Sequence, residues 1–225
     1  MLPTTGFLVP LLIASKITLQ LAGSALLLGL LLALGLTALR RGRCALLRRV
    51  AHGFTLLLQG LPELLVLLLI YFVPTQLLHL LTQRYINLSS FGCGVVALAL
   101  IFAATATETL HGALEAVAKG QTEAATALGL TPWAVFWRIV LPQAWRYALP
   151  GLGNQWLVLI KDTALVSFIE INDLMRQTHI AALATGKKLT YFLLAALIYL
   201  VMTGISQLML SRLRQMASHF ERSPG

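Results

Sequence analysis

The stretch "EAATALGLTPWAVFWRIVLP", residues 123–142, predicts two short helices joined by a glycine bend. Residues 123–128 favour a helix, and Gly129 suits the left-handed conformation that commonly ends one. Thr131 is a typical N-cap residue, and Pro132 fits the first turn of a second helix. Helical spacing gives this second helix an apolar aromatic face, which consists of Trp133, Phe136 and Trp137.

An exposed aromatic surface of this kind usually marks a contact with a protein partner, although it could also pack against the chain's own helix ends. Two prolines follow, Pro142 and Pro150. Because proline lacks an N–H and clashes with the preceding turn, we expect each to end the helix before it.

The rest of the chain has the composition of an integral membrane protein. Of its 225 residues, 58% are hydrophobic and 11% are charged, whereas soluble domains carry about 25% charged residues. Only helices or closed barrels span a bilayer, and the apolar segments here are far longer than the roughly 10 residues of a barrel strand. The sequence therefore predicts an all-α membrane protein. The net charge of +9 is explained by membrane topology rather than by nucleic-acid binding.

Five stretches are long and apolar enough to cross the membrane, because a spanning helix needs about 20 residues. We expect the spans at about residues 17–39, 54–73, 92–111, 150–171 and 190–212. The second span should be one helix that is kinked at Pro62. The first span carries a small residue at every fourth position, Ala25, Gly29 and Ala33, which we interpret as a helix-packing seam.

Basic residues set the expected orientation. An arginine cluster, residues 40–49, separates the first two spans, and the long third connection and the C-terminal tail add more Lys and Arg. Because cytoplasmic loops collect basic residues, the N-terminus should lie outside and the C-terminus in the cytoplasm. The last outer loop, with Arg176, Lys187 and Lys188, is an exception to this pattern.

Three charged residues fall near the middle of the expected spans. Lys161 and Asp162 stand side by side in "LVLIKDTALV", residues 157–166, and Glu63 lies at the centre of span two. A charge at the bilayer centre costs about 2.5–3.5 kcal/mol on insertion scales, so such residues should face one another or a wet cavity. A structural ion pair between Lys161 and Glu63 is one alternative, and a site for a transported solute is the other.

The residue types suit a zwitterionic solute with a cationic tail. Lys161 could bind the α-carboxylate, and the carboxylates could bind the α-ammonium group and a guanidinium or ammonium side chain. Helical spacing places Asn154, Val158 and Lys161 on one stripe. Glu108 could line an exit or cap the following loop. The predicted substrate-binding residues are Glu63, Glu108, Asn154, Gln155, Lys161, Asp162 and Thr163.

The opening stretch fits the pattern EAA-x3-G-x6-F-x2-I-x-LP, which resembles the EAA loop in permease subunits of bacterial ABC importers. Residues 60–72, "GLPELLVLLLIYF", and residues 148–178 resemble the polar amino acid permeases more narrowly, above all the arginine permeases. In that family the EAA loop, here about residues 115–145, is the helix that couples to the cytoplasmic ATPase. The resemblance assigns this coupling to Glu123, Ala124, Ala125, Gly129, Phe136 and Pro142.

The resemblance implies one transmembrane domain over residues 1–225 with the MetI-like fold of type I ABC importers. It also implies a multi-pass protein of the bacterial inner membrane that imports polar amino acids, with arginine favoured. The implied partners are an ABC ATPase dimer, a second permease subunit, identical or related, a periplasmic or extracellular amino acid binding protein, and membrane lipid. No G-x4-G-K-[ST] pattern occurs in the chain, so ATP and Mg should be bound by the partner ATPase and no cofactor by this chain.

Two positions depart from the family pattern. The family usually has an arginine where this chain has Gln59, and often another where it has His111. Arginine, lysine, ornithine, histidine and glutamine remain open as substrates. A membrane scaffold that only docks a cytoplasmic partner, and an ion-coupled amino acid carrier, are the alternative functions.

Overall fold

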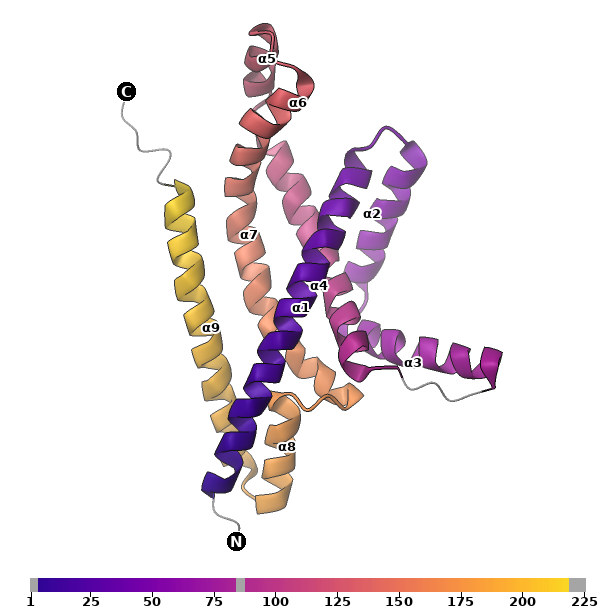
Figure 1. The fold of residues 1–225 in the computed structure, drawn as a ribbon, viewed down its shortest axis with the longest axis vertical. Coiled ribbons are helices and arrows are strands. Elements are labelled where there is room, and N and C mark those ends of the chain that lie inside the picture. The colour runs from indigo at the N-terminus through magenta and orange to yellow at the C-terminus, as the bar shows by residue number, and fades with distance from the viewer. Residues whose placement is uncertain (1–3, 84–87, 219–225) are drawn as a thin grey trace.

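The computed structural model describes residues 4–83 and 88–218, and every regular element in these residues is helical (Figure 1). The α-helices are α1 (Leu8–Arg41), α2 (Ala45–Gly60), α3 (Glu63–Thr82), α4 (Ser90–Glu115), α5 (Lys119–Ala127), α6 (Pro132–Val135), α7 (Leu141–Asp162), α8 (Leu174–Thr185) and α9 (Lys188–Ser218). Two 3-10 helices, η1 (Thr4–Phe7) and η3 (Thr163–Ile169), and one π-turn, η2 (Phe136–Val140), complete the described part. The predicted all-α architecture is confirmed for these residues.

The packing of α1 against α4 forms the centre of the molecule. The buried stripe of α1 includes Ala25, Gly29 and Ala33, as the spacing of small residues predicts. A Cβ atom on Gly29 would lie 2.8 Å from Cδ1 of Phe102 and 3.0 Å from the carbonyl oxygen of Ala99. Only a residue without a side chain lets the two helices approach this closely, so the seam has the packing role that the sequence indicates.

The expected second span, residues 54–73, is two helices rather than one kinked helix. Helix α2 ends at Gly60 and α3 begins at Glu63, while Leu61 and Pro62 have extended backbones with ψ of 144° and 132°. The reason is steric, because a proline ring disfavours the helical conformation of the residue before it. In Figure 1, α2 runs back alongside α1 and α3 then leads away to the side.

The expected fourth span also differs from the structure. Neither proline ends a helix: Pro142 lies in the first turn of α7, and Pro150 lies inside it. A π-turn at residues 136–140 instead carries the chain from α6 directly into α7. The wider π-turn that precedes Pro142 lets the proline ring fit without the clash that it would make in a regular α-helix. At the other end α7 stops at Asp162, and η3 replaces the expected continuation to residue 171.

Four of the described helices are long and apolar enough to cross a membrane, namely α1, α3, α4 and residues 188–215 of α9. The first, third and fifth expected spans fall within α1, α4 and α9. Many large apolar side chains of α1, α3 and α9 are exposed, as suits surfaces that meet lipid or another subunit. The turn after α1, helices α5 and α6, and the end of α9 gather at one end of the molecule, opposite the N-terminus and α8 (Figure 1).

Candidate functional site

A cavity of about 200 Å³ lies between α3, α4 and α7. Three of the predicted binding residues, Glu63, Gln155 and Asp162, line it together. Glu63 reaches it because the helix break at Pro62 makes Glu63 the first residue of α3. Gln155 and Asp162 are seven residues apart on α7, which is about two helical turns and therefore one face. The remaining lining residues are Ile101, Phe102, Thr105, Val158 and Leu159.

The polar groups of this cavity are mainly hydrogen-bond acceptors. The carboxyl groups of Glu63 and Asp162 are close enough to interact electrostatically, and two neighbouring carboxylates favour a proton or a bound cation between them. The Gln155 side chain donates from Nε2 to Oγ1 of Thr109 at 2.7 Å. Its Oε1 atom is buried and has no partner among the described residues. The two carboxyl groups make the cavity favour a cation that carries several hydrogen-bond donors.

Two other predicted residues lie outside this cavity. Lys161 is exposed, and within the described residues it forms no ion pair with Glu63, so the structural ion pair considered from the sequence is absent. Thr163 is fully buried, and its hydroxyl donates to the carbonyl oxygen of Ile160 at 2.5 Å. Its hydroxyl is therefore turned into the protein.

The stripe expected on α7 is displaced by one residue. The face that lines the cavity carries Gln155, Val158 and Asp162, rather than Asn154, Val158 and Lys161. The side-chain oxygen of Asn154 instead accepts a hydrogen bond from the Arg214 guanidinium at 3.1 Å. Arg214 also donates to the carbonyl oxygen of Pro150 at 3.1 Å, so this residue joins α9 to α7.

Glu108 forms an ion pair that the sequence did not reveal. The guanidinium of Arg40, at the end of α1, donates to Oε1 of Glu108 at 2.5 Å, and the Arg40 side chain is only 9% exposed. The hydroxyl of Thr55 in α2 donates to the same oxygen at 3.4 Å. Glu108 thus joins three helices and does not line the cavity of about 200 Å³. The predicted topology could have indicated this pair, because Arg40 and Glu108 were both expected near the cytoplasmic ends of their spans.

Gln59 and His111, the two residues that differ from the family pattern, have partners other than Glu108. Gln59 donates from Nε2 to the carbonyl oxygen of Ala104 at 3.1 Å, which ties α2 to α4. His111 lies 3.3 Å from the carboxylate of Glu115, one turn further along α4. The cation beside Glu108 therefore comes from α1, and neither position 59 nor position 111 supplies it.

The predicted helix, bend and helix of the EAA loop are present. Helix α5 is followed by Gly129 with φ of +80°, a left-handed conformation that glycine adopts without strain. Thr131 caps α6, because its hydroxyl oxygen accepts from the N–H of Ala134 at 3.4 Å, and Pro132 follows in the first turn. The predicted Glu123 to Leu128 helix is longer than expected and begins at Lys119.

The loop has a buried side and an exposed side. Ala125 is only 2% exposed and packs in a small apolar cluster against which Phe136 also lies. Glu123, Ala124 and Pro142 are exposed on the surface. The other buried members of the cluster are Val117, Val135, Val140 and Ala144. Of the residues assigned to coupling, Ala125 and Phe136 hold the loop together, and Glu123 and Ala124 are accessible to a partner.

Comparison with known proteins agrees with this architecture. Over 218 residues the chain is 49% identical to the arginine ABC transporter permease protein ArtQ of Haemophilus influenzae, covering 97% of this chain and 98% of that protein. It is 36% identical to the histidine/lysine/arginine/ornithine transport system permease protein HisQ of Escherichia coli, covering 89% of this chain and 90% of that one. The crystal structure of an amino acid ABC transporter with histidines superposes with a TM-score of 0.83 at 33% identity, covering 92% of this chain and 94% of that one.

The family match covers most of the fold. Residues 25–216, from the middle of α1 to the last turns of α9, match the family described as binding-protein-dependent transport system inner membrane component. This range includes the cavity between α3, α4 and α7 and the whole EAA loop. The chain therefore belongs to the inner membrane components of binding-protein-dependent transport systems, as one of the amino acid ABC transporter permeases.

Proposed function

We propose that this chain is the permease subunit through which an ATP-driven importer of the bacterial inner membrane translocates basic amino acids, with arginine as the preferred substrate. The observation that carries the proposal is the pair of carboxyls, those of Glu63 and Asp162, that line one cavity together with Gln155. A guanidinium group presents five N–H donors in a planar fork and matches carboxylates bidentately.

The size of the cavity also supports a small solute. Its volume of about 200 Å³ is below the roughly 300–1,000 Å³ of pockets for drug-sized ligands. Lys161 is exposed on a neighbouring part of α7, and it would bind the α-carboxylate of a solute whose cationic tail occupies the cavity. The printed names of the relatives, which mention arginine and the histidine/lysine/arginine/ornithine group, support the same substrate class.

ATP hydrolysis belongs, in this proposal, to an ATPase dimer that docks on the EAA loop. The exposed Glu123 and Ala124 and the outward-facing indole of Trp133, 71% exposed, give the partner a surface, and Ala125 fixes α5 to the chain itself. ATP and Mg are then bound by that partner. A binding protein delivers the solute at the opposite end, and a second permease, identical or related, completes the path.

The proposed topology has five spans, and α7 is the one that carries Lys161 and Asp162. It puts the N-terminus and α8 outside, and the arginine-rich turn after α1, the EAA loop and the C-terminus in the cytoplasm. The turn after α1, helices α5 and α6, and the end of α9 lie at one end of the molecule (Figure 1), which supports this orientation because basic segments stay on the cytoplasmic side.

The test is uptake of radiolabelled arginine by cells that carry the chain with its ATPase and binding protein. Glu63→Gln and Asp162→Asn should each lower uptake about tenfold or more, because a hydrogen bond to a charged group contributes roughly 1.5–3 kcal/mol. Glu170→Gln is the matched control, since Glu170 is exposed outside the cavity. All three variants should still co-purify with the ATPase.

The outcomes separate the alternatives. Unchanged uptake in both cavity variants would contradict the proposed site, and a scaffold that transports nothing would show no uptake in any variant. Uptake into vesicles that hold an ion gradient but no ATP would identify an ion-coupled carrier instead.

A further inference from the structure

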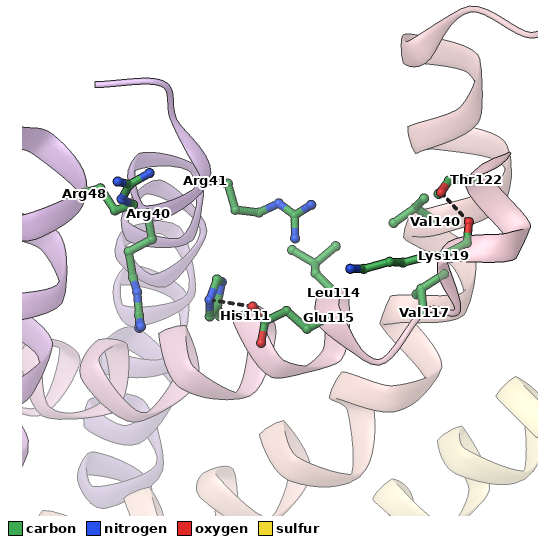
Figure 2. Close-up of a pocket in the computed structure, with 10 residues that line it drawn as sticks. All are labelled: Arg40, Arg41, Arg48, His111, Leu114, Glu115, Val117, Lys119, Thr122 and Val140. Carbon is green, nitrogen blue, oxygen red and sulfur yellow. Dashed lines mark hydrogen bonds and ion pairs between the residues drawn. The ribbon is translucent and has the colours of Figure 1, made fainter. Parts of the chain in front are cut away.

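A basic cavity of about 590 Å³ lies at the end of the molecule where α1, α2, α4 and α5 meet. Among the described residues, four cationic side chains line it, together with His111 and one carboxylate, that of Glu115. The cations are Arg40, Arg41, Arg48 and Lys119. They come from three helices: Arg40 and Arg41 from the end of α1, Arg48 from α2 and Lys119 from the start of α5 (Figure 2).

Most of this positive charge has no counter-ion among the residues that the structure describes. Arg40 is engaged by Glu108, and the carboxylate of Glu115 is engaged by His111. Within residues 4–83 and 88–218, no carboxylate forms an ion pair with the remaining three cations, Arg41, Arg48 and Lys119. In Figure 2 the side chains of Arg41 and Lys119 extend toward each other, and Leu114 lies beside them. Like charges that converge repel each other, and an anion between them removes that repulsion.

An apolar groove of about 640 Å³ adjoins the basic cavity, and the two share Arg41 and Leu114 as lining residues. One wall of the groove is the last turns of α1, with Leu34 and Ala38, and the other includes Trp137 and Trp145. Both tryptophans are 48% exposed. Indole side chains are enriched at the level where acyl chains meet headgroups.

From this adjacency we propose that the two depressions form one binding site for an anionic phospholipid. The phosphate lies among Arg41, Arg48 and Lys119, and an acyl chain follows the groove past Ala38 to Trp145. Basic pockets between transmembrane helices on the cytoplasmic side bind anionic headgroups in other membrane proteins. A zwitterionic lipid fits less well, because its ammonium group would add to an uncompensated positive field.

The proposed occupant is an amphiphile because the basic cavity and the apolar groove adjoin each other. A soluble phosphate would use the basic cavity and leave the groove empty, and an apolar helix of another subunit would fill the groove and leave the cations unpaired. The site also joins the end of α1 to Lys119 and Thr122 at the start of α5. A bound lipid therefore ties the spanning helices to the loop on which the ATPase is proposed to dock.

The test measures lipid bound to the full-length chain in its assembled complex, by native mass spectrometry and by titration with labelled phosphatidylglycerol. Phosphatidylethanolamine and inorganic phosphate serve as competitors. The triple variant Arg41→Gln, Arg48→Gln, Lys119→Gln should lower phosphatidylglycerol affinity about tenfold or more, given the contribution of each basic residue near an anionic membrane surface. The matched control, Lys187→Gln, Lys188→Gln, Arg212→Gln, removes three exposed cations elsewhere and should leave that affinity unchanged.

A second variant separates a lipid from a free phosphate. Ala38→Trp fills the groove without removing a charge, so it should lower phosphatidylglycerol binding several-fold while any binding of inorganic phosphate stays the same. Lys119→Gln alone, at an exposed position, provides a substitution that leaves the helix packing intact and should weaken the lipid measurably.

Three results would overturn the inference. They are equal phosphatidylglycerol affinity in the wild type and the triple variant, full competition by inorganic phosphate with no effect of Ala38→Trp, and absence of bound lipid from the wild-type complex because another subunit covers the groove. None of these measurements depends on arginine uptake, so failure of the proposed transport function and failure of the lipid site are distinguishable.

Discussion

Arg40 and Glu108 are 68 residues apart in the chain, yet their side chains meet at 2.5 Å where α1, α2 and α4 converge. Removal of one member leaves the other charge partly buried without its partner, which is more costly than loss of the pair itself. Because the Glu108 side chain is 39% exposed, solvent screens part of this cost.

We therefore expect Arg40→Gln and Glu108→Gln each to lower the melting temperature of the purified chain. The double variant Arg40→Gln, Glu108→Gln should be more stable than the sum of the single effects predicts, because residues in one ion pair couple in a double-mutant cycle. Thermal unfolding of all four proteins in the same detergent measures the coupling. Strict additivity would show that the pair contributes nothing to stability.

Gly29 provides a test of the contact between α1 and α4. Gly29→Ala places a methyl group 3.0 Å from a backbone oxygen of Ala99, which cannot rotate away, so the helices must separate. Overpacking of this kind typically costs about 1–3 kcal/mol. Gly35→Ala is the matched control on the same helix, because a Cβ at Gly35 meets nothing within 4 Å. A melting temperature that falls equally in both variants would contradict the close approach.

The one-residue displacement on α7 leads to a third prediction, which depends on the proposed site. Gln155→Leu removes a polar side chain from the cavity wall and the hydrogen bond to Thr109, so arginine uptake should fall several-fold. Asn154→Leu removes only the contact with Arg214 at the α9 surface, so uptake should remain near the wild-type level. Radiolabelled uptake, normalised to the amount of protein in the membrane, distinguishes the two. A larger loss of uptake in Asn154→Leu than in Gln155→Leu would instead support the face expected from the sequence, with Asn154, Val158 and Lys161.

The sequence predicted the helical class, the small-residue seam of α1 and the local geometry at Gly129 and Thr131, because each depends on short-range chemistry. It did not predict that Pro62 separates two helices, since a proline in an apolar run is compatible with either a kink or a break. Nor did it predict the π-turn that joins α6 directly to α7, so that the helix does not end at Pro142.

The candidate site was predictable only in part. Charges inside apolar spans identify Glu63 and Asp162, because their cost in a membrane indicates a functional role. Packing against α4 and α9 determines how α7 is rotated, and therefore that Gln155 rather than Asn154 lines the cavity. The spacing of apolar residues along α7 does not predict this rotation. The ion pair of Arg40 with Glu108 depends on the pairing of two distant helix ends, and neighbouring residues give no direct indication of it.

A fourth prediction concerns Asp173, the N-cap of α8, which lies outside the expected spans. Its carboxylate accepts from the N–H groups of Arg176 at 3.0 Å and Met175 at 3.2 Å. Burial nevertheless raises the pKa of Asp173 from 3.8 to about 6, although these hydrogen bonds and the Arg176 charge act in the opposite direction. Because the pKa of Asp173 is higher in the folded chain, the fold favours the protonated carboxyl. The resulting stabilisation is fully present below pH 3.8 and is lost as the pH rises through about 6.

Asp173→Asn keeps a capping oxygen and cannot ionise, so it is the matched reference. The melting temperature of the wild type relative to Asp173→Asn should fall between about pH 4 and pH 6.5 and then level off, because Asp173 is ionised in both states above that range. Thermal unfolding of both proteins at four pH values measures the difference. A wild-type advantage that grows with rising pH would mean that the capping hydrogen bonds outweigh burial and that the pKa of Asp173 is depressed instead.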